Sequence, residues 1–267
     1  MTVEPFELFA LRYGHHAGRT DAMNFIGGDL HDQGSDLDYF VWVARRGDRV
    51  VLIDTGFSEE VGARRNRQVL HPPAALLHRL GIAPDRIEDV VLTHLHFDHA
   101  GTLGDYTSAR FHLQDSEMAF ATGRCMCHAE FARPFEVEDV VTMVRHVHAG
   151  RVDFHDGDSE IQPGLSLHRI GGHTSGLQAV RVLTRRGWVV IASDASHLYA
   201  NMHGGRPFPI VANAIEMLEG FRRIHALADG PDHVIPGHDP LVMALYPAPS
   251  QEFEGMVARL DAPPRQI

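Results

Sequence analysis

The feature that most constrains this chain is a dense run of metal-ligand residue types, Thr93-His94-Leu95-His96-Phe97-Asp98-His99-Ala100-Gly101. It follows the apolar tripeptide Val90-Val91-Leu92, which predicts the end of a buried strand. Side chains alternate along an extended chain, so the first two histidines share one side, and the following turn brings the aspartate and third histidine round to them. Imidazole nitrogens and carboxylate oxygens bind Zn and other first-row metals. The run therefore predicts a metal site and not merely a solvated turn rich in histidine.

Charge and cysteine usage exclude several kinds of partner. The chain has 24 Lys and Arg against 35 Asp and Glu, a net charge of −11, and no basic block, which argues against nucleic acid. No apolar run approaches the roughly 20 residues of a membrane span. No export signal is visible at the start of the sequence, so we expect a cytoplasmic protein. Cys125 and Cys127 stand two apart with no second pair, which predicts reduced thiols and no thiolate zinc site.

Strand patterns alternate with helical patterns along the whole chain. Strands are expected at 6–13, 39–44, 50–54, 90–92, 109–113, 152–155, 165–170, 179–183, 188–192 and 233–236, and helices at 61–80 (with a second helix opening at Pro72 and Pro73), 116–122, 138–148 and 211–228. Without a repeat or linker, we expect one α/β domain over 1–267 with two sheets inside and helices outside. Residues 123–150 predict a helical insertion lying over the metal site.

Three later residues repeat the placement of the opening run. His173, Asp194 and His238 each follow an apolar strand pattern, where loops on rigid elements commonly carry functional side chains. Together with the opening run they supply five histidines and two aspartates. That number exceeds one tetrahedral zinc site and suits two metals that share a carboxylate. Zn is expected, and Fe, Mn or Co would accept the same donors.

The pattern His94-x-His96-x-Asp98-His99 … His173 … Asp194 … His238 resembles the metallo-β-lactamase superfamily at all seven positions, across nearly the whole chain. The resemblance implies an αββα sandwich of two mixed sheets flanked by helices, with the metals at one edge. It implies the following ligands: His94, His96 and His173 on one metal, Asp98, His99 and His238 on the other, and Asp194 on both. Asp54 matches the family's buried aspartate, which orients the ligand loop.

Two metals about 3.5–4 Å apart generate hydroxide near neutral pH and polarise a carbonyl, so no Ser or Cys nucleophile is needed. Asp98 is placed to take up the proton and deliver it to the leaving oxygen. This chemistry suits a small-molecule lactone or ester. Thioesters, amides and organophosphates are open alternatives, and a di-iron redox protein is a further one, although the sequence has no ferredoxin-like Cys pattern.

Within the superfamily, the flanks of the ligands are similar to those of the N-acyl-homoserine lactonases, which act in quorum quenching. Gly172-His173-Thr174 and Ser193-Asp194-Ala195-Ser196 are typical of them. The lactonases usually carry a tyrosine three places after the bridging aspartate, placed to donate a hydrogen bond to the lactone. This chain has His197 there, and its nearest tyrosine is Tyr199. Both are therefore candidate catalytic residues together with Asp98.

The candidate substrate contacts are apolar side chains. Phe97 lies inside the ligand run and is expected to line the pocket, and an acyl slot is expected from Met23, Phe25 and Phe208, with Phe120, Met202 and Ile210 as further candidates. No cluster of Arg or Lys is apparent, which counts against phosphorylated or nucleotide substrates. Both a monomer and a homodimer are compatible with the sequence.

Overall fold

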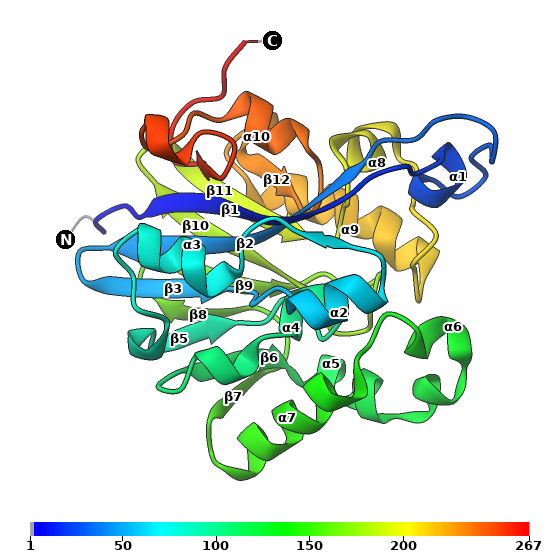
Figure 1. Ribbon diagram of the computed structural model, residues 1–267, viewed down its shortest axis with the longest axis horizontal. Coiled ribbons are helices and arrows are strands. Elements are labelled where there is room, and N and C mark those ends of the chain that lie inside the picture. Colours follow the sequence, from blue (N-terminus) through cyan, green and yellow to red (C-terminus); the bar gives the residue numbers. More distant parts are fainter. Residues whose placement is uncertain (1–2, 267) are drawn as a thin grey trace.

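The computed structural model describes residues 3–266, which form two facing β-sheets with helices on both outer sides (Figure 1). The first sheet has the order β13-β1-β2-β3-β5-β6-β7, and β4 pairs with β1. Its strands are β1 Glu7–His16, β2 Leu37–Arg46, β3 Arg49–Ile53, β4 Gln68–Val69, β5 Asp89–Val91, β6 Arg110–Gln114, β7 Val152–His155 and β13 Val257–Arg259. Pairing is parallel from β3 to β7 and antiparallel elsewhere, so the sheet is mixed.

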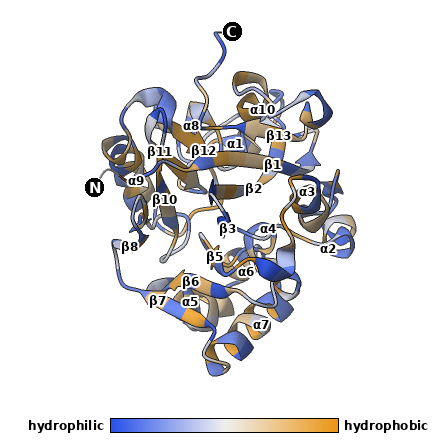
Figure 2. Cartoon of the chain, turned by 90° about the vertical axis from the view of Figure 1, so that its left-hand side faces the viewer, coloured by the Kyte–Doolittle hydropathy of each residue, from blue (hydrophilic) through white to orange (hydrophobic). Residues whose placement is uncertain are grey.

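The second sheet has the order β12-β11-β10-β9-β8 and is also mixed, because β12 runs parallel to β11 while the other pairs are antiparallel. Its strands are β8 Ser159–Gln162, β9 Leu165–Arg169, β10 Gln178–Thr184, β11 Gly187–Ser193 and β12 Val234–Pro236. Figure 2 shows apolar residues gathered along the central strands. The predicted αββα sandwich of two mixed sheets is confirmed.

Alternation along the strands builds three apolar layers. In β1, Leu8 and Ala10 face the second sheet, whereas Phe9 and Leu11 face the outer helices. The layer between the sheets contains fully buried side chains such as Trp42. The two outer layers pack under α3, α5 and α7 on one side and under α8 and α9 on the other. Each sheet is therefore covered on both faces, which fixes its register.

The α-helices are α1 Asp21–Asn24, α2 Glu59–Arg64, α3 Pro73–Arg79, α4 Phe97–Ala100, α5 Asp115–Thr122, α6 Ala129–Ala132, α7 Val137–His148, α8 Tyr199–Gly204, α9 Ala214–Leu227 and α10 Leu241–Leu245. The 3₁₀ turns are η1 Pro84–Arg86, η2 Leu103–Asp105, η3 Arg124–Cys127, η4 Pro231–His233 and η5 Gln251–Phe253. None of the helices between residues 3 and 266 is long and apolar enough to cross a membrane.

One predicted helix is interrupted. The pattern over 61–80 is helical only to Arg64, because Asn66 adopts a left-handed φ of 55° and β4 then pairs with β1. The second helix opens with Pro73 in its first turn, as expected. The irregular stretch between α2 and α3 matters for the site, because it carries Arg67 to the cavity described below.

Candidate metal centre

The seven side chains predicted to bind metal converge at one edge of the sandwich, where strand ends meet. The opening run follows β5 and continues into α4, while the later ligands follow β9, β11 and β12. All seven are buried, with Asp98 the most exposed at 8%. Strands β3 and β5 are parallel to each other, as are β11 and β12, and all four end at this edge. Residues distant in sequence therefore become neighbours.

The ligand atoms form two trios with Asp194 between them. His94, His96 and His173 make one group, and Asp98, His99 and His238 make the other, with ligand atoms of each group within 4.8 Å of one another. The Oδ2 atom of Asp194 lies 3.2 Å from His173 Nε2, and its Oδ1 lies 2.9 Å from His238 Nε2. One oxygen therefore faces each trio, which is the arrangement that a bridging carboxylate requires.

Contacts behind three of the imidazoles select their tautomers. The Nδ1–H groups of His173 and His238 donate to the backbone carbonyls of Ile210 at 2.6 Å and Asp38 at 2.9 Å. His99 Nδ1 lies 2.7 Å from an oxygen of the Asp54 carboxylate. With the proton on Nδ1, each ring presents its Nε2 lone pair to the centre.

The donor set fits two divalent cations. His94 Nε2 and His99 Nε2 are buried and form no hydrogen bond within the described part of the chain. Such orphaned atoms normally indicate a missing partner such as an ion. Burial and the neighbouring imidazoles lower the pKa of His94 and His96 well below its ordinary value. Both are therefore neutral at pH 7, which is the form of imidazole that binds a metal.

A hydrogen-bonded network ties the ligand loops to both sheets. Asp54 accepts from the Thr93 backbone N–H at 2.7 Å and from its hydroxyl at 2.8 Å. The Thr93 hydroxyl also hydrogen-bonds with that of Ser193 at 2.8 Å. Asp54 and Ser193 have left-handed φ values of 61° and 48°, unusual for residues other than glycine. Such strain costs on the order of 1–3 kcal/mol and persists only where the surroundings impose it.

Glu117 is a positioning residue that the sequence analysis missed. Its fully buried carboxylate accepts from the backbone N–H groups of Leu95 and Gly176, at 3.0 and 3.1 Å, and from the Thr174 hydroxyl at 2.6 Å. It thus links the loop of the opening run to the loop of His173. Burial, partly offset by these hydrogen bonds, raises its pKa to about 6. Nothing local distinguishes it from an ordinary helix glutamate, so only the tertiary contacts identify it.

The cavity above the ligands has two compartments that share His96, Pro134, His173 and Ile210. The first compartment is otherwise formed by Phe120, Phe131, Pro209 and Val211, together with the charged side chains of Glu130 and Arg133. The polar compartment is formed by Arg19, Leu37, Tyr39, Arg67, Phe97, Asp98, Asp194, His197 and His238. Phe97 lines the cavity as predicted. Two arginines stand in the polar compartment although no basic cluster is apparent in the sequence, because they belong to loops far apart along the chain.

His197 and Tyr199, the two candidate catalytic residues after Asp194, lie in different places. His197 lines the cavity with Nε2 2.9 Å from Asp194 Oδ2, and burial lowers its pKa to about 4. Tyr199 begins α8, and its ring packs in the apolar layers while burial and the nearby Tyr246 raise its pKa. The prediction that Tyr199 reaches the site is therefore wrong, since the start of α8 directs its side chain elsewhere.

Phe120 and Ile210 line the cavity, but the other four predicted acyl contacts do not. Met202 is buried in the apolar layer under α8 and α9. Met23 is 47% exposed on α1. Phe25 packs with Leu37 and Leu198, and its ring is covered by Arg206, whose Cζ lies 3.9 Å from the ring centroid. Phe208 lies behind His197, with the two rings stacked at a centroid distance of 3.5 Å. Local apolar character could not show which side of each loop faces the metal ligands.

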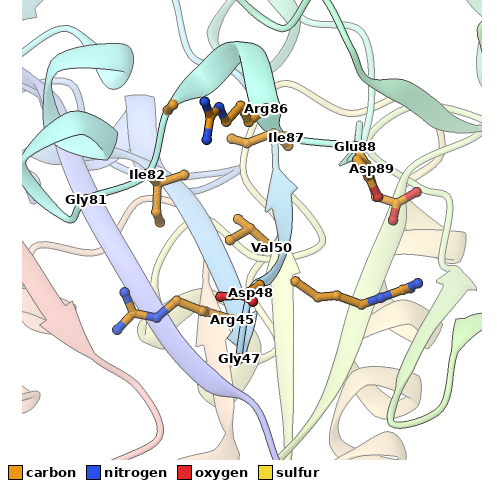
Figure 3. Close-up of a pocket in the computed structure, with 12 residues that line it drawn as sticks. Arg45, Gly47, Asp48, Val50, Gly81, Ile82, Arg86, Ile87, Glu88 and Asp89 are labelled. Carbon is orange, nitrogen blue, oxygen red and sulfur yellow. The ribbon is translucent and has the colours of Figure 1, made fainter.

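A larger hollow of about 630 Å³ lies at the other end of β3 and β5 (Figure 3). It is formed by the β2–β3 turn and the segment before β5, with Arg45, Asp48 and Glu88 among its lining residues. The ligands follow the opposite end of β5. None of its lining residues is a histidine or cysteine, so the chemistry belongs to the smaller cavity.

A model of the metallo-beta-lactamase superfamily matches residues 35–245. The chain belongs to this superfamily. Among characterised relatives, it is 29% identical over 183 residues to N-acyl homoserine lactonase AiiB of Agrobacterium fabrum (strain C58 / ATCC 33970), covering 62% of this chain and 66% of that protein. It is 30% identical over 134 residues to an N-acyl homoserine lactonase of Bacillus thuringiensis, covering 50% and 48%. The chain thus spans about half to two thirds of the length of these relatives.

Solved structures confirm the metallo-beta-lactamase fold. A quorum-quenching N-acyl homoserine lactone lactonase superposes with a TM-score of 0.74 at 22% identity, covering 90% of this chain and 95% of that one. The dizinc quorum-quenching lactonase AidC, in complex with a product, gives 0.66 at 15% identity, covering 90% of each chain. The hydrolase AbOPH gives 0.69 at 16% identity, covering 90% and 92%.

Proposed function

We propose that this metallo-beta-lactamase superfamily protein is a dinuclear metal-dependent hydrolase that opens N-acyl homoserine lactones or a related lactone. The observation that carries the proposal is Asp194, whose two oxygens face two separate trios of metal-ligand residue types. Relatives named N-acyl homoserine lactonase support the choice of substrate. We assign the seven ligands as the family pattern implies, with Asp54 holding His99 from behind.

Bound in this site, two divalent metals would supply a hydroxide nucleophile at neutral pH and polarise the lactone carbonyl. The chain's own residues then have three tasks. Asp98 is placed to carry the proton to the leaving alkoxide, since its carboxylate lies at the cavity surface, 3.7 Å from His238 Nε2. His197 stands where lactonases carry tyrosine; its Nε2–H donates to Asp194 Oδ2 at 2.9 Å and so orients that carboxylate. The compartment lined by Phe120, Phe131, Pro209 and Val211 excludes water beside the metal ligands.

Several finer assignments belong to the same proposal. Zn²⁺ is the proposed native metal, because five histidines and two aspartates are donors that zinc favours. We also propose a cytoplasmic location, as expected from the sequence. We propose a single domain over 1–267 in which residues 123–150 are a helical insertion. Part of that segment, Phe131 and Pro134, lines the cavity.

A hydrolysis screen combined with metal analysis tests the proposal. Purified protein should contain two metals per chain and open N-acyl homoserine lactones with acyl chains from four to twelve carbons. Activity should disappear on chelation and return when Zn²⁺ is added. Thioesters and phosphotriesters should be poorer substrates in the same assay. Two bound metals with no lactone opening at any chain length would contradict the lactonase assignment.

A further inference from the structure

Two arginines from separate loops line the polar compartment beside the metal ligands. Arg19 lies between β1 and α1 and is only 8% exposed, while Arg67 lies between α2 and β4 and is half-buried. Within residues 3–266, neither guanidinium forms an ion pair with a carboxylate, whereas the half-buried Arg12, Arg65 and Arg169 do. A buried charge without a counterion is costly, so this pair requires an explanation.

Uncharged groups hold both side chains in place. Arg19 donates from Nε to the Asn24 side-chain oxygen at 2.6 Å and from Nη2 to the Met23 carbonyl, and its Nη1 lies 3.3 Å from His16 Nδ1. Arg67 donates from Nη1 to the carbonyls of Arg65 and Asn66 at 2.9 and 3.2 Å. Its Nε is buried and has no hydrogen-bond partner in the described part of the chain. These contacts fix the orientation of both guanidinium groups, and none of them involves a carboxylate.

The carboxylates nearest to these loops are engaged elsewhere. Asp194 faces His173, His197 and His238, and Asp98 lies among His99 and His238. Asp38 pairs with Arg12 at 2.8 Å and with His15 at 2.7 Å. Asp36 is exposed and accepts from the Gly18 backbone N–H. Asp36 therefore acts on Arg19 only at a distance, and none of these four carboxylates forms an ion pair with either arginine.

Tyr39 adds a neutral donor to the same wall. Its ring packs against His238 at a centroid distance of 5.1 Å, and it lines the same compartment as Arg67. Burial and the charge of Asp98 raise the pKa of Tyr39, so the hydroxyl stays protonated at any physiological pH. The wall therefore presents two guanidinium groups and one hydroxyl, all of them donors, to a cavity that also contains the reacting centre.

We propose that Arg19 and Arg67 bind a carboxylate at the far end of the substrate's acyl group, so that the preferred substrate is an anionic lactone. This inference rests on the proposed function and narrows its substrate class. A planar carboxylate suits the remaining N–H groups of the two guanidinium forks, and charge-assisted hydrogen bonds of this kind discriminate strongly against a neutral isostere. It also accounts for a cationic wall in a chain with a net charge of −11.

Matched lactones test the inference. N-succinyl-homoserine lactone ends in a carboxylate, and N-succinamoyl-homoserine lactone ends in a carboxamide of nearly the same shape; glutaryl and adipoyl pairs vary the reach. For the metal-loaded wild-type protein, kcat/KM for the best acid should exceed that for its amide at least about tenfold. Arg67→Gln should bring the ratio close to one, and Arg67→Lys should retain part of it. Arg49→Gln, at the exposed start of β3, is the matched control and should leave the ratio unchanged.

Binding of the ring-opened products gives a readout that does not depend on turnover. Calorimetry on the metal-loaded protein should give a Kd at least about tenfold lower for N-succinyl-homoserine than for N-succinamoyl-homoserine, and Arg67→Gln should remove the difference. Equal Kd values for every acid and amide pair, in a protein that opens neutral lactones, would overturn the inference and leave the proposed function standing. A Kd difference that depends on Arg67, without turnover of any lactone, would support the inference and contradict the lactonase proposal.

Discussion

The floor of the cavity is made from strand ends, whereas its walls are made from loops. The seven ligand candidates follow β5, β9, β11 and β12, and the contacts behind them reach into both sheets. The walls come from residues 19–39, 67, 120–135 and 197–211, most of which lie outside the regular elements. Strand ends are fixed by the register of the sheets, so they suit a centre that needs accurate placement. Loops can vary without disturbing the fold, so they suit substrate selection.

The largest expected effect, on metal content and activity, comes from Asp194 in the floor of the cavity. Asp194→Asn retains the shape of the side chain but removes the charge and one of the two oxygens that face the trios. We expect the metal content to fall from two per chain to one or fewer, and lactone hydrolysis to fall about 10³-fold. Elemental analysis and kinetics on one sample measure both. Asp48→Asn, at the exposed β2–β3 turn, is the control. Two retained metals with near-normal activity would show that Asp194 is not a bridge.

The next largest effect, on metal affinity, is expected at Asp54, which holds the metal ligands from behind. Asp54→Asn weakens the contacts to His99 and Thr93 but tolerates the left-handed φ of this position, as asparagine often does. Metal affinity, measured by competition with a chelator, should fall about 10- to 100-fold, a usual result when a group behind a ligand is lost. Asp54→Ala should in addition lower the melting temperature. Unchanged affinity in the asparagine variant would mean that the strained carboxylate serves the fold alone.

A smaller effect, on kcat, is expected at His197, which lies between the metal ligands and the loops of the cavity wall. His197→Phe preserves the stack on Phe208 but removes the nitrogen that lies 2.9 Å from Asp194. We expect kcat to fall about tenfold or more while two metals remain bound. His197→Tyr, which restores the tyrosine of the lactonases, should recover part of the loss. If kcat is the same in the phenylalanine variant, His197 only packs against its neighbours.

The smallest expected effect is on stability and comes from Asp139 in helix α7. Burial, and then the charge of Glu136, raise the pKa of Asp139 to about 7, whereas an unfolded aspartate titrates near 4. The folded state therefore binds a proton that the unfolded state has released, so stability falls as pH rises from about 4 to 7. Asp139→Asn should melt a few degrees higher than wild type at pH 8 and no differently at pH 4, with unchanged kcat.

Thermal melting across this pH range, with exposed Asp85→Asn as the control, measures the effect. The variant's melting temperature should exceed that of wild type at pH 8, and this difference should shrink to zero as the pH falls to 4. The same pH dependence in both proteins would place the responsible group elsewhere.

Much of the floor was predictable from sequence because its signals are local. Apolar strand runs end where histidines and aspartates begin, and these patterns hold for the stretches before His94, Asp194 and His238. Strand alternation predicted the two-sheet core in the same way. The helix expected over 61–80 shows the limit, since Asn66 and the pairing of β4 with β1 override a helical pattern there.

The sequence by itself determined the ligand types, their spacing and the sheets that carry them, because strand periodicity acts over a few residues. Only the tertiary structure decided that His197 faces the cavity while Tyr199 faces Tyr246, and that Glu117 joins two ligand loops. It also brought Arg19 and Arg67 to one wall. These outcomes depend on how separate loops pack against one another. A loop side chain has no periodicity that shows which way it points, so its role emerges only when the fold supplies its neighbours.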